Sequence, residues 1–377
     1  MRIGIDARLL CEPLTGIGRY TKELCQALTA YADHLYLYTP KALPASQLDL
    51  SNTTLRSGRS RARIGKMLWS QSVLPWWAMQ DEVDVFWGTT HRLPRFLPSS
   101  MPRVVTIHDL VWKFAAETMR PTSRFLESRL MPPAIRAADR IIADSQSTAN
   151  DICEVFPQAR DKVRVVHLGV SELVDSEGID SLRPLGIDGP YFLFVGTLEP
   201  RKNLRRLLNA YARLSPSIRA RAKCVIAGGK GWGGVDLKQL RTDLGLDRDV
   251  VLTGYVSDVQ LATLYAHAKF LVMPSLYEGF GLPLIESMSR GVPVLTSDCS
   301  SLPEVAGEAG LLVDPQDEWS IGGGLSVLLT DEARLASLAG HARPNAQRFT
   351  WAKAASETMK VFEEAIHTRQ ADHPGRS

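Results

Sequence analysis

A glycine-bearing loop that leads into a helix could bind an anion. The segment PSLYEGFGLPLIESMSRGVPVLTSD (residues 274–298) follows the strand FLVMP, and Pro283 suits a first helical turn, where its missing N–H removes no helical bond. Amides at a helix N-terminus are unpaired and lie at the positive end of the helix dipole, so they favour phosphate. The amides expected there are those of Phe280, Gly281 and Leu282.

Two carboxylates flank this predicted anion site. Glu278 lies in the loop before the helix and Glu286 in the first turn after it, so each stands to one side of the anion. Carboxylates in these positions suit hydroxyl groups, such as those of a sugar on one side and a ribose on the other. For Glu286 alone, the alternative is an acid stabilised by the helix dipole.

Two adjacent cations, Arg201 and Lys202, occur in GTLEPRKNL, directly after the apolar strand YFLFVG. Lysine offers a point charge and arginine a planar fork of donors, and together they could neutralise a diphosphate. The alternative is a solvated basic loop that opens the helix NLRRLL. The Asp-x-Asp sequence at 247–249 leads into VVLTGY and is typical of a turn, so we expect these cations rather than a metal to supply the counter-charge.

The first half of the chain contributes a glycine loop and a histidine. PLTGIGRYTKEL places Gly16 and Gly18 between a strand and a helix, but Thr21 stands where a dinucleotide fingerprint needs its third glycine, which disfavours NAD binding. VVTIHDLVW is a buried strand that ends in His108 and Asp109, at the sheet edge where doubly wound domains bind ligands. A simple turn and a structural histidine are the alternatives.

The elements that position these residues alternate between short apolar strands and helices, which predicts parallel βαβ units and an α/β fold. Two such series occur, and 377 residues suit two domains. We expect an N-terminal Rossmann-like domain over residues 1–170 and a C-terminal one over residues 185–347. The polar segment 171–190 is expected as an exposed linker.

Composition limits the function classes. The net charge of +3 disfavours nucleic-acid binding for the protein as a whole. The cysteines are odd in number and lack CxxC spacing, which fits neither a disulfide framework nor a zinc site and indicates a reducing compartment. MRIGIDARLL is typical of a buried strand rather than a signal peptide, and no apolar run reaches the roughly 18 residues of a membrane span. We expect a cytoplasmic protein, soluble or peripheral to the membrane.

A basic and tryptophan-rich segment lies between the strand-like stretches LYLYT and VDVFWG. Cations beside interfacial aromatic side chains suit an anionic membrane surface, and a solvated loop followed by a core-packing helix is an equal alternative. The side chains concerned are Arg56, Arg59, Arg61, Arg63, Lys66, Trp69, Trp76 and Trp77.

The spaced glutamates of EGFGLPLIE resemble the signature of the retaining glycosyltransferases of family four. GTLEPRKNL, AGGKGW, LTGYVSD and PVLTSDCSSLPEVAGEAGLLVDP follow the family's order, and the resemblance covers nearly the whole chain. It implies the GT-B fold, in which two Rossmann-like domains face each other across a cleft and the last helix, here 350–368, packs back on the first. It also implies transfer with retention of anomeric configuration. We expect no metal or other cofactor.

The resemblance assigns roles in the second domain. Lys202, with Arg201, would stabilise the leaving diphosphate, although Thr197 stands where many relatives have an arginine. Glu286 would bind ribose hydroxyls and Glu278 the sugar.

The resemblance also assigns roles near the sugar and the base. His108 would face the transferred sugar with Asp109 as its orienting neighbour, and Gly18 would bring a backbone amide near the donor phosphates. Recognition of the base is expected near LTGYVSD, around Val256 and Asp258.

The overall pattern resembles bacterial mannosyl- and rhamnosyltransferases of O-antigen or other surface polysaccharides. A GDP-linked donor and a lipid-linked saccharide acceptor are therefore expected. A nucleotide-sugar epimerase or hydrolase on the same fold and a non-catalytic sugar-nucleotide-binding protein are the alternatives. Donor turnover without acceptor would reveal the first, and tolerance of the loss of His108 and Glu278 the second.

Overall fold

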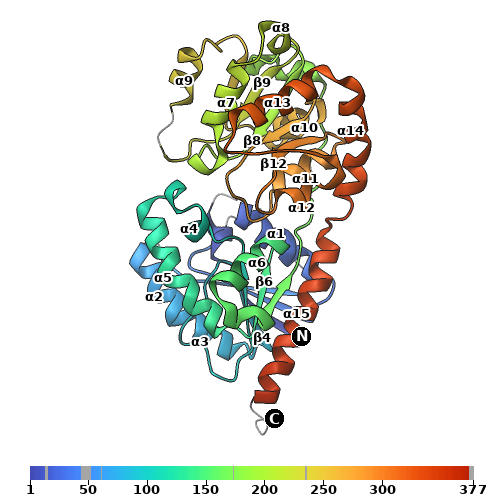
Figure 1. Ribbon diagram of the computed structural model, residues 1–377. Helices are drawn as coiled ribbons and strands as arrows, with labels where there is room; N and C mark the ends of the chain where they lie inside the picture. Colours follow the sequence, from blue (N-terminus) through green and yellow to red (C-terminus); the bar gives the residue numbers. More distant parts are fainter. Residues whose placement is uncertain (13–15, 44–51, 61, 173, 234–235, 373–377) are drawn as a thin grey trace. The chain divides into compact units, whose positions relative to one another are not determined.

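The chain forms two compact units. The computed structural model describes residues 1–12, 16–43, 52–60, 62–172, 174–233 and 236–372, coloured along the chain in Figure 1. Unit 1 comprises Met1–Leu110, Phe125–Gly169 and Thr350–Ser377. Unit 2 comprises Val111–Arg124 and Val170–Phe349.

Unit 1 is built on a parallel sheet whose described strands lie in the order β3-β2-β1-β4-β5-β6-β7. The strands are β1 (Arg2–Asp6), β2 (His34–Thr39), β3 (Thr53–Ser57), β4 (Val85–Gly88), β5 (Arg103–Ile107), β6 (Arg140–Ala143) and β7 (Val163–Val165). Their apolar side chains are buried along most of the central strands, as parallel sheets covered by helices require. The order is the Rossmann order extended by one strand.

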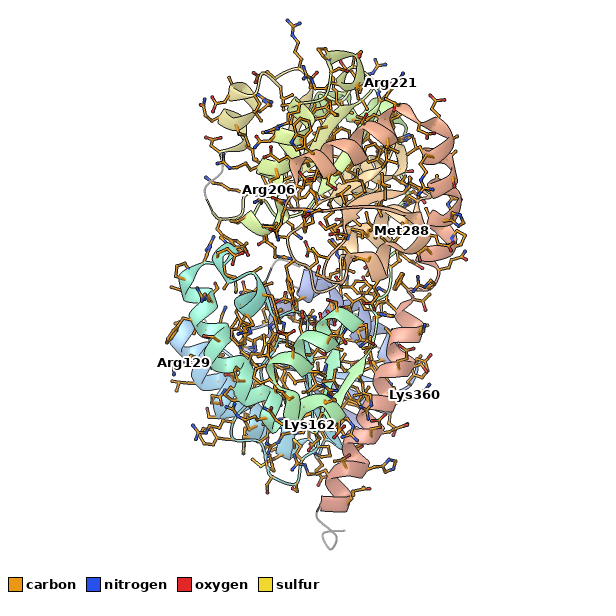
Figure 2. The ribbon with its side chains drawn as sticks, in the orientation of Figure 1. Arg129, Lys162, Arg206, Arg221, Met288 and Lys360 are labelled. Atoms are coloured by element: carbon orange, nitrogen blue, oxygen red, sulfur yellow. The ribbon has the colours of Figure 1, made fainter. Side chains whose placement is uncertain are left out.

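Helices join these strands. They are η1 (Arg8–Cys11), α1 (Gly16–Leu28), α2 (Arg63–Gln71), α3 (Val73–Gln80), α5 (Pro121–Ala137), α6 (Gln146–Val155), η3 (Pro157–Lys162) and α15 (Trp351–Asp372). Helices α2 and α3 cover the sheet with one apolar cluster, in which Trp69 and Leu74 pack with Tyr38 and Phe86. Exposed charged residues such as Arg129 of α5 and Lys360 of α15 mark the solvent sides of their helices (Figure 2).

Unit 2 repeats the plan with the described strands in the order β10-β9-β8-β11-β12-β13. They are β8 (Tyr191–Val195), β9 (Lys223–Ala227), β10 (Val250–Gly254), β11 (Leu271–Met273), β12 (Val294–Ser297) and β13 (Gly310–Val313). The helical elements are α4 (Val111–Phe114), η2 (Ala116–Thr118), η4 (Ile179–Leu185), η5 (Pro200–Lys202), α7 (Leu204–Ala212), α8 (Pro216–Arg219), α9 (Leu237–Asp243), α10 (Asp258–His267), α11 (Leu282–Ser289), α12 (Leu302–Ala306), η6 (Gly307–Ala309), α13 (Glu318–Thr330) and α14 (Glu332–Ala346). The predicted α/β class with two doubly wound sheets is confirmed.

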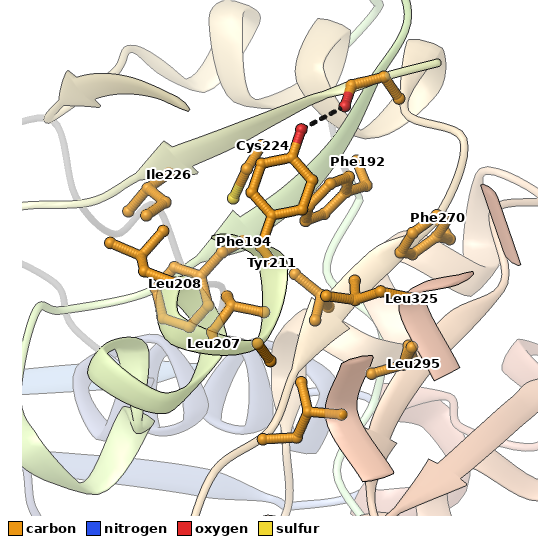
Figure 3. Close-up of a cluster of buried hydrophobic side chains, with 14 of the residues drawn as sticks. Phe192, Phe194, Leu207, Leu208, Tyr211, Cys224, Ile226, Phe270, Leu295 and Leu325 are labelled. Atoms are coloured by element: carbon orange, nitrogen blue, oxygen red, sulfur yellow. Dashed lines mark hydrogen bonds between the residues drawn. The ribbon is translucent and has the colours of Figure 1, made fainter. Parts of the chain in front are cut away.

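The core of unit 2 lies between its sheet and helices α7 and α13 (Figure 3). The rings of Phe192 and Phe270 stack at a centroid distance of 5.1 Å. Tyr211 is fully buried, and its hydroxyl donates to the carbonyl oxygen of Ala222 at 2.8 Å. Because this polar group is satisfied, the tyrosine can fill the core without a desolvation penalty.

An insertion from the first half of the chain belongs to unit 2. Residues Val111–Arg124 follow β5, yet they cluster with the second unit. There Phe114 stacks on Tyr277 at 6.1 Å, and the indole N–H of Trp232 donates to the carbonyl oxygen of Thr118 at 3.1 Å. The sequence pattern, which counts these residues with the first domain, does not indicate this arrangement.

The segments that connect the two units also differ from the sequence-based prediction. Most of 171–190, expected as an exposed linker, is described and clusters with unit 2, and Leu182 in η4 is fully buried. Helix α15 lies in unit 1, where Phe362 packs on Trp87 at 5.7 Å. Hydrophobic contacts therefore hold this last helix in unit 1 although it follows unit 2 in the sequence.

Candidate active site

In unit 2, the loop between β11 and α11 is shaped for close approach. Gly281 precedes α11 with a φ of 106°, a left-handed conformation that side chains rarely adopt. A Cβ there would come within 3.0 Å of the Leu302 side chain. Pro283 lies in the first turn of α11, so the amides predicted to bind an anion do stand at a helix N-terminus.

Glu278, which lies in this loop, forms the centre of a buried charge cluster. Its carboxylate accepts hydrogen bonds from Lys202 at 2.6 Å and from Arg201. Arg201 also donates to Glu199 at 2.6 Å. Glu278 and Lys202 are only 6% and 8% exposed, so the structure brings three predicted residues together with one, Glu199, that the sequence analysis missed.

The electrostatics of this charge cluster depend on its pairing. Burial alone would raise the pKa of Glu278, but attraction to Arg201 and Lys202 overrides it and lowers the pKa to about 2. Burial lowers the pKa of Lys202, and Glu278 opposes that shift. The cluster contains two cations and two carboxylates, as a buried set of charges requires.

Two serines after β12 hold the backbone of the Glu278 loop. The amide of Glu278 donates to the Ser300 hydroxyl at 3.0 Å. The Ser301 hydroxyl is within hydrogen-bond reach of the carbonyl oxygens of Glu278 and Phe280, at 3.0 and 2.9 Å. Both serines lie in PVLTSDCSS, and their place in the loop after a strand is the signal that could have identified them.

Glu286 occupies a different position from the one predicted. Helix α11 begins at Leu282, so Glu286 falls in its second turn, and the first turn contains no acid. An acid stabilised by the helix dipole is therefore the wrong interpretation, because that effect is confined to the first turn. Glu286 is 3% exposed, and the Tyr265 hydroxyl of α10 donates to its carboxylate at 2.7 Å.

Val256 and Asp258 lie after the β10 strand. Val256 is partly buried, and the exposed Asp258 is the first residue of α10. Ser257 caps this helix in a reciprocal pair with Gln260. The capped helix start fixes the backbone on which base recognition was predicted.

In unit 1, His108 follows β5 and is nearly sealed, with 6% of its surface exposed. Its Nδ1 lies 2.6 Å from the carboxylate of Asp144, and its Nε2 lies 2.9 Å from the carbonyl oxygen of Thr89. Since a carbonyl oxygen and an ionised carboxylate only accept, both ring nitrogens donate and the ring carries a proton on each. The His108 and Tyr20 rings also pack edge to face at a centroid distance of 4.8 Å.

The pKa of His108 reflects this pairing. Burial lowers it, but attraction and hydrogen bonding to Asp144 outweigh burial, and the net pKa is raised. Asp109, expected as the orienting neighbour, adds the weakest of the contributing attractions. The carboxylate that orients the ring is Asp144, which the sequence analysis did not identify.

A second histidine supports the backbone of the first. His91 adopts a φ of 57°, and its Nε2 accepts the backbone N–H of His108 at 3.0 Å. Its Nδ1 therefore carries the proton and donates to Glu127 at 3.2 Å. Hydrogen bonds from His91 and Arg92, with the positive charge of Arg92, override burial and lower the pKa of Glu127 to about 2.

Gly18 lies in a helix and not in the loop that the sequence predicts. Gly16 and Gly18 lie inside the first turn of α1 and not in a loop before it. The amides of a first helical turn lack intrahelical partners, so this position still offers donors. Gly18 is buried in that turn.

The basic and tryptophan-rich segment divides between core and surface. Trp69 is 3% exposed and Trp77 is partly buried, and both belong to the cluster under α2 and α3. Arg56 pairs with Asp81 and Lys66 with Glu12, as salt bridges on the same unit. Arg59 and Trp76 remain exposed, whereas Arg61 and the side chain of Arg63 lie outside the described residues.

Across the described parts of the chain, every helix is too short or too polar to pass through a lipid bilayer.

Comparisons with known proteins match both units. Residues 14–172 match the family described as Glycosyltransferase Family 4, and residues 182–348 match Glycosyl transferases group 1. The O-antigen chain mannosyltransferase B of Escherichia coli is 31% identical and aligns over 96% of this chain and 99% of its own. The serotype-specific mannosyltransferase WbdA of Escherichia coli is 32% identical over 73% of this chain and 35% of its own.

Solved structures show the same fold. Sucrose-phosphate synthase from Thermosynechococcus elongatus superimposes with a TM-score of 0.75 at 20% identity, covering 97% of this chain and 99% of its own. WaaG, a glycosyltransferase involved in lipopolysaccharide biosynthesis, superimposes with a TM-score of 0.70 at 17% identity over the whole of both chains. The predicted GT-B class is confirmed, and the chain belongs to glycosyltransferase family 4 and is a glycosyltransferase.

Proposed function

We propose that this glycosyltransferase moves a hexose, mannose or the related rhamnose, from a GDP-linked sugar to a growing lipid-linked glycan. The acceptor would belong to surface polysaccharide assembly. The names of the two similar Escherichia coli mannosyltransferases support the choice of sugar. The transfer retains anomeric configuration and uses no metal.

The observation that carries this proposal is the buried cluster of Arg201, Lys202 and Glu278 beside the N-terminus of α11. Two cations and a set of helix-terminal amides are what a diphosphate leaving group needs. Burial strengthens each of these interactions relative to water. The charge that a metal supplies in other enzymes would come here from Arg201 and Lys202.

Glu278 holds these cations before the donor arrives. Without a carboxylate partner, burial would favour the neutral form of Lys202, so Glu278 keeps the lysine charged and in place. In the proposed reaction the diphosphate takes over as partner of Lys202 and Arg201. The Glu278 carboxylate then becomes available to sugar hydroxyls.

The protein would act through electrostatics and positioning. As the bond between sugar and diphosphate loosens, the acceptor hydroxyl approaches from the same face, and a leaving phosphate oxygen takes its proton. No side chain needs to form a covalent intermediate. Preorganised cations and amides stabilise the charge that develops on the diphosphate, and orientation lowers the entropic cost.

His108 and Glu286 are proposed to hold the two ends of the donor. His108, locked by Asp144 and Thr89, presents a protonated ring whose positive charge favours an electron-rich sugar face or hydroxyl. Glu286 would bind the ribose hydroxyls, with Tyr265 fixing one of its oxygens.

Peripheral membrane contact is a further part of the proposal. Arg59 and Trp76 are exposed in the basic and tryptophan-rich segment, and exposed cations beside tryptophan suit an anionic surface. Replacing both should reduce sedimentation of the protein with anionic vesicles. Unchanged sedimentation would contradict a membrane contact at this segment.

Calorimetric titration with GDP, UDP and ADP in the presence of EDTA tests the donor and the absence of a metal together. Preference for GDP would support a mannosyl- or rhamnosyl-type donor. Preference for UDP would keep the transferase but reject that donor, and binding of none would reject the cluster as a diphosphate site. Transfer to a lipid-linked glycan, followed by NMR of the new linkage, then tests retention.

A further inference from the structure

Unit 1 contains a cavity of about 1100 Å³ that the chemistry described above does not use. It is lined by residues of α2, of the segment 92–96 after β4, and of the part of α5 that follows Arg124, and all of its lining residues belong to unit 1. Its volume slightly exceeds the usual range of ligand sites, which is about 300–1000 Å³. The cavity is therefore large enough for a ligand of substantial size.

The wall of this cavity is mostly apolar and includes side chains that solvent reaches. Met67, Phe96 and Leu130 line it and are 61%, 67% and 40% exposed. Single exposed apolar residues are ordinary, but several around one concave surface indicate a surface that an apolar partner covers. The concave shape suits a chain that enters the cavity better than a flat surface.

The cavity also carries excess positive charge. Three of its cations are balanced locally, since Arg8 pairs with Asp6, Lys66 with Glu12 and Arg92 with Glu127.

Two further cations in the cavity lack such balance. Arg95 and Arg136 are exposed, and neither pairs with a carboxylate among the residues that the structure describes. Unbalanced guanidinium groups beside an apolar wall complement an anion attached to an apolar chain.

We propose that this cavity binds the lipid phosphate of the acceptor, with the apolar chain against Met67, Phe96 and Leu130 and the phosphate at Arg95 and Arg136. This assignment rests on the proposed function, since it gives the lipid-linked acceptor a defined site on unit 1. The phosphate is the anion that the unbalanced arginines complement, and the lipid chain is the apolar partner that the exposed wall lacks.

The test uses dodecyl phosphate, below its micelle concentration, as a soluble probe of lipid phosphate. Calorimetric titration of the full chain should give saturable one-to-one binding. Inorganic phosphate, which lacks the chain, and dodecyltrimethylammonium, which has the same chain with the opposite charge, should each bind about tenfold more weakly or worse. Equal binding of dodecyltrimethylammonium, or no saturable binding of dodecyl phosphate, would overturn the proposal.

Variants locate the binding. Ala137→Trp fills the cavity from α5, and the pair Arg95→Gln with Arg136→Gln removes its unbalanced charge. Each should weaken dodecyl phosphate by about tenfold. Arg160→Gln, an exposed arginine of unit 1 outside the cavity, is the matched control and should bind as the unchanged protein does.

A second variant covers the case in which Ala137→Trp does not fold. Phe96→Ser changes a mostly exposed side chain and should also weaken the probe. If all these variants bind dodecyl phosphate as tightly as Arg160→Gln, the probe binds elsewhere and the proposal fails.

Titration with GDP separates this inference from the proposed function. GDP is assigned to residues of unit 2, so its affinity should be unchanged in every cavity variant. Binding of dodecyl phosphate by a protein that binds no nucleotide would reject the donor assignment and leave the cavity intact. GDP binding without dodecyl phosphate binding would reject the assignment of the cavity to lipid phosphate and leave the donor assignment unaffected.

Discussion

The ammonium group of Lys202 lies 2.6 Å from a carboxylate oxygen of Glu278, and both side chains are almost fully buried. A buried pair of this kind gives little net stability, because desolvation cancels most of the attraction. Removing one partner is costly, however, since the other charge stays buried. The pair therefore suits a site in which an anionic ligand later replaces the carboxylate.

Lys202→Met should weaken GDP binding by about ten- to hundredfold, because one charge-assisted hydrogen bond contributes roughly 1.5–3 kcal/mol. Calorimetric titration measures the change. Lys223→Met is the matched control, since Lys223 pairs with Asp188 in a solvent-exposed bridge of the same unit. A similar loss in both variants, or no loss in Lys202→Met, would contradict a diphosphate site at Lys202.

The sequence predicts those site residues that directly follow a strand or lie in a glycine-bearing loop. It does not predict the role of Asp144. It directly follows β6 as His108 directly follows β5, and Ile107 lies opposite Ala143 in the sheet, so the two side chains meet at one edge. Without that register, nothing in the sequence says which of several strand-end acids reaches the histidine.

The role of His91 and the helix position of Glu286 could not be predicted from the sequence, for two other reasons. His91 acts through a left-handed backbone conformation, which no residue pattern marks for histidine. Glu286 was placed one turn too early because the start of α11 depends on the conformation of Gly281, and helix ends are the least predictable part of an element.

Lowering the pH should decrease the stability of the folded state, because Glu278 becomes protonated. Its pKa falls from the ordinary 4.5 to about 2 in the fold, so above pH 4.5 the ionised carboxylate makes the fold roughly 3 kcal/mol more stable than the protonated form would. That contribution is lost as the pH falls from about 4.5 to 2. Denaturant midpoints measured across this range should therefore decline more steeply for the unchanged protein than for Glu278→Gln.

Glu127 provides an internal reference for that experiment. Its pKa is also about 2, and it remains in Glu278→Gln, so part of the acid sensitivity should persist in the variant. Curves of equal slope for the two proteins would show that Glu278 does not titrate as the buried pair requires.

Asp144→Asn should lower the pKa of His108. In the unchanged protein the Asp144 charge outweighs burial and raises that pKa, so the charged ring stabilises the fold below its ordinary pKa and this stability is lost as the pH rises through the raised value. Without the charge, burial acts unopposed. NMR titration of the histidine ring measures the shift directly, and the rate of sugar transfer at neutral pH should fall with it.

Asp109→Asn is the control for Asp144→Asn. Asp109 adds the weakest attraction to His108, so its replacement should move the pKa less than Asp144→Asn does. A larger shift in Asp109→Asn would restore Asp109 as the orienting residue. The turnover of His108→Ala should fall while GDP affinity stays nearly unchanged, because the nucleotide is assigned to residues of unit 2.

Gly281→Ala should damage the anion site through the backbone. At a φ of 106° an alanine is strained, and its Cβ would press on the Leu302 side chain at 3.0 Å, so the variant should lose about 1–3 kcal/mol of stability. Relief of that strain would shift the amides at the start of α11, and GDP binding should weaken as well. Thermal unfolding and calorimetric titration measure the two effects.

Gly323→Ala provides the opposite expectation on the same unit. Gly323 lies within helix α13, and a Cβ there would meet nothing within 4 Å. Alanine is favoured over glycine in a helix by about 1 kcal/mol, so this variant should be more stable and should bind GDP unchanged. If Gly281→Ala and Gly323→Ala behave alike in stability and in GDP binding, the left-handed turn before α11 does not shape the site.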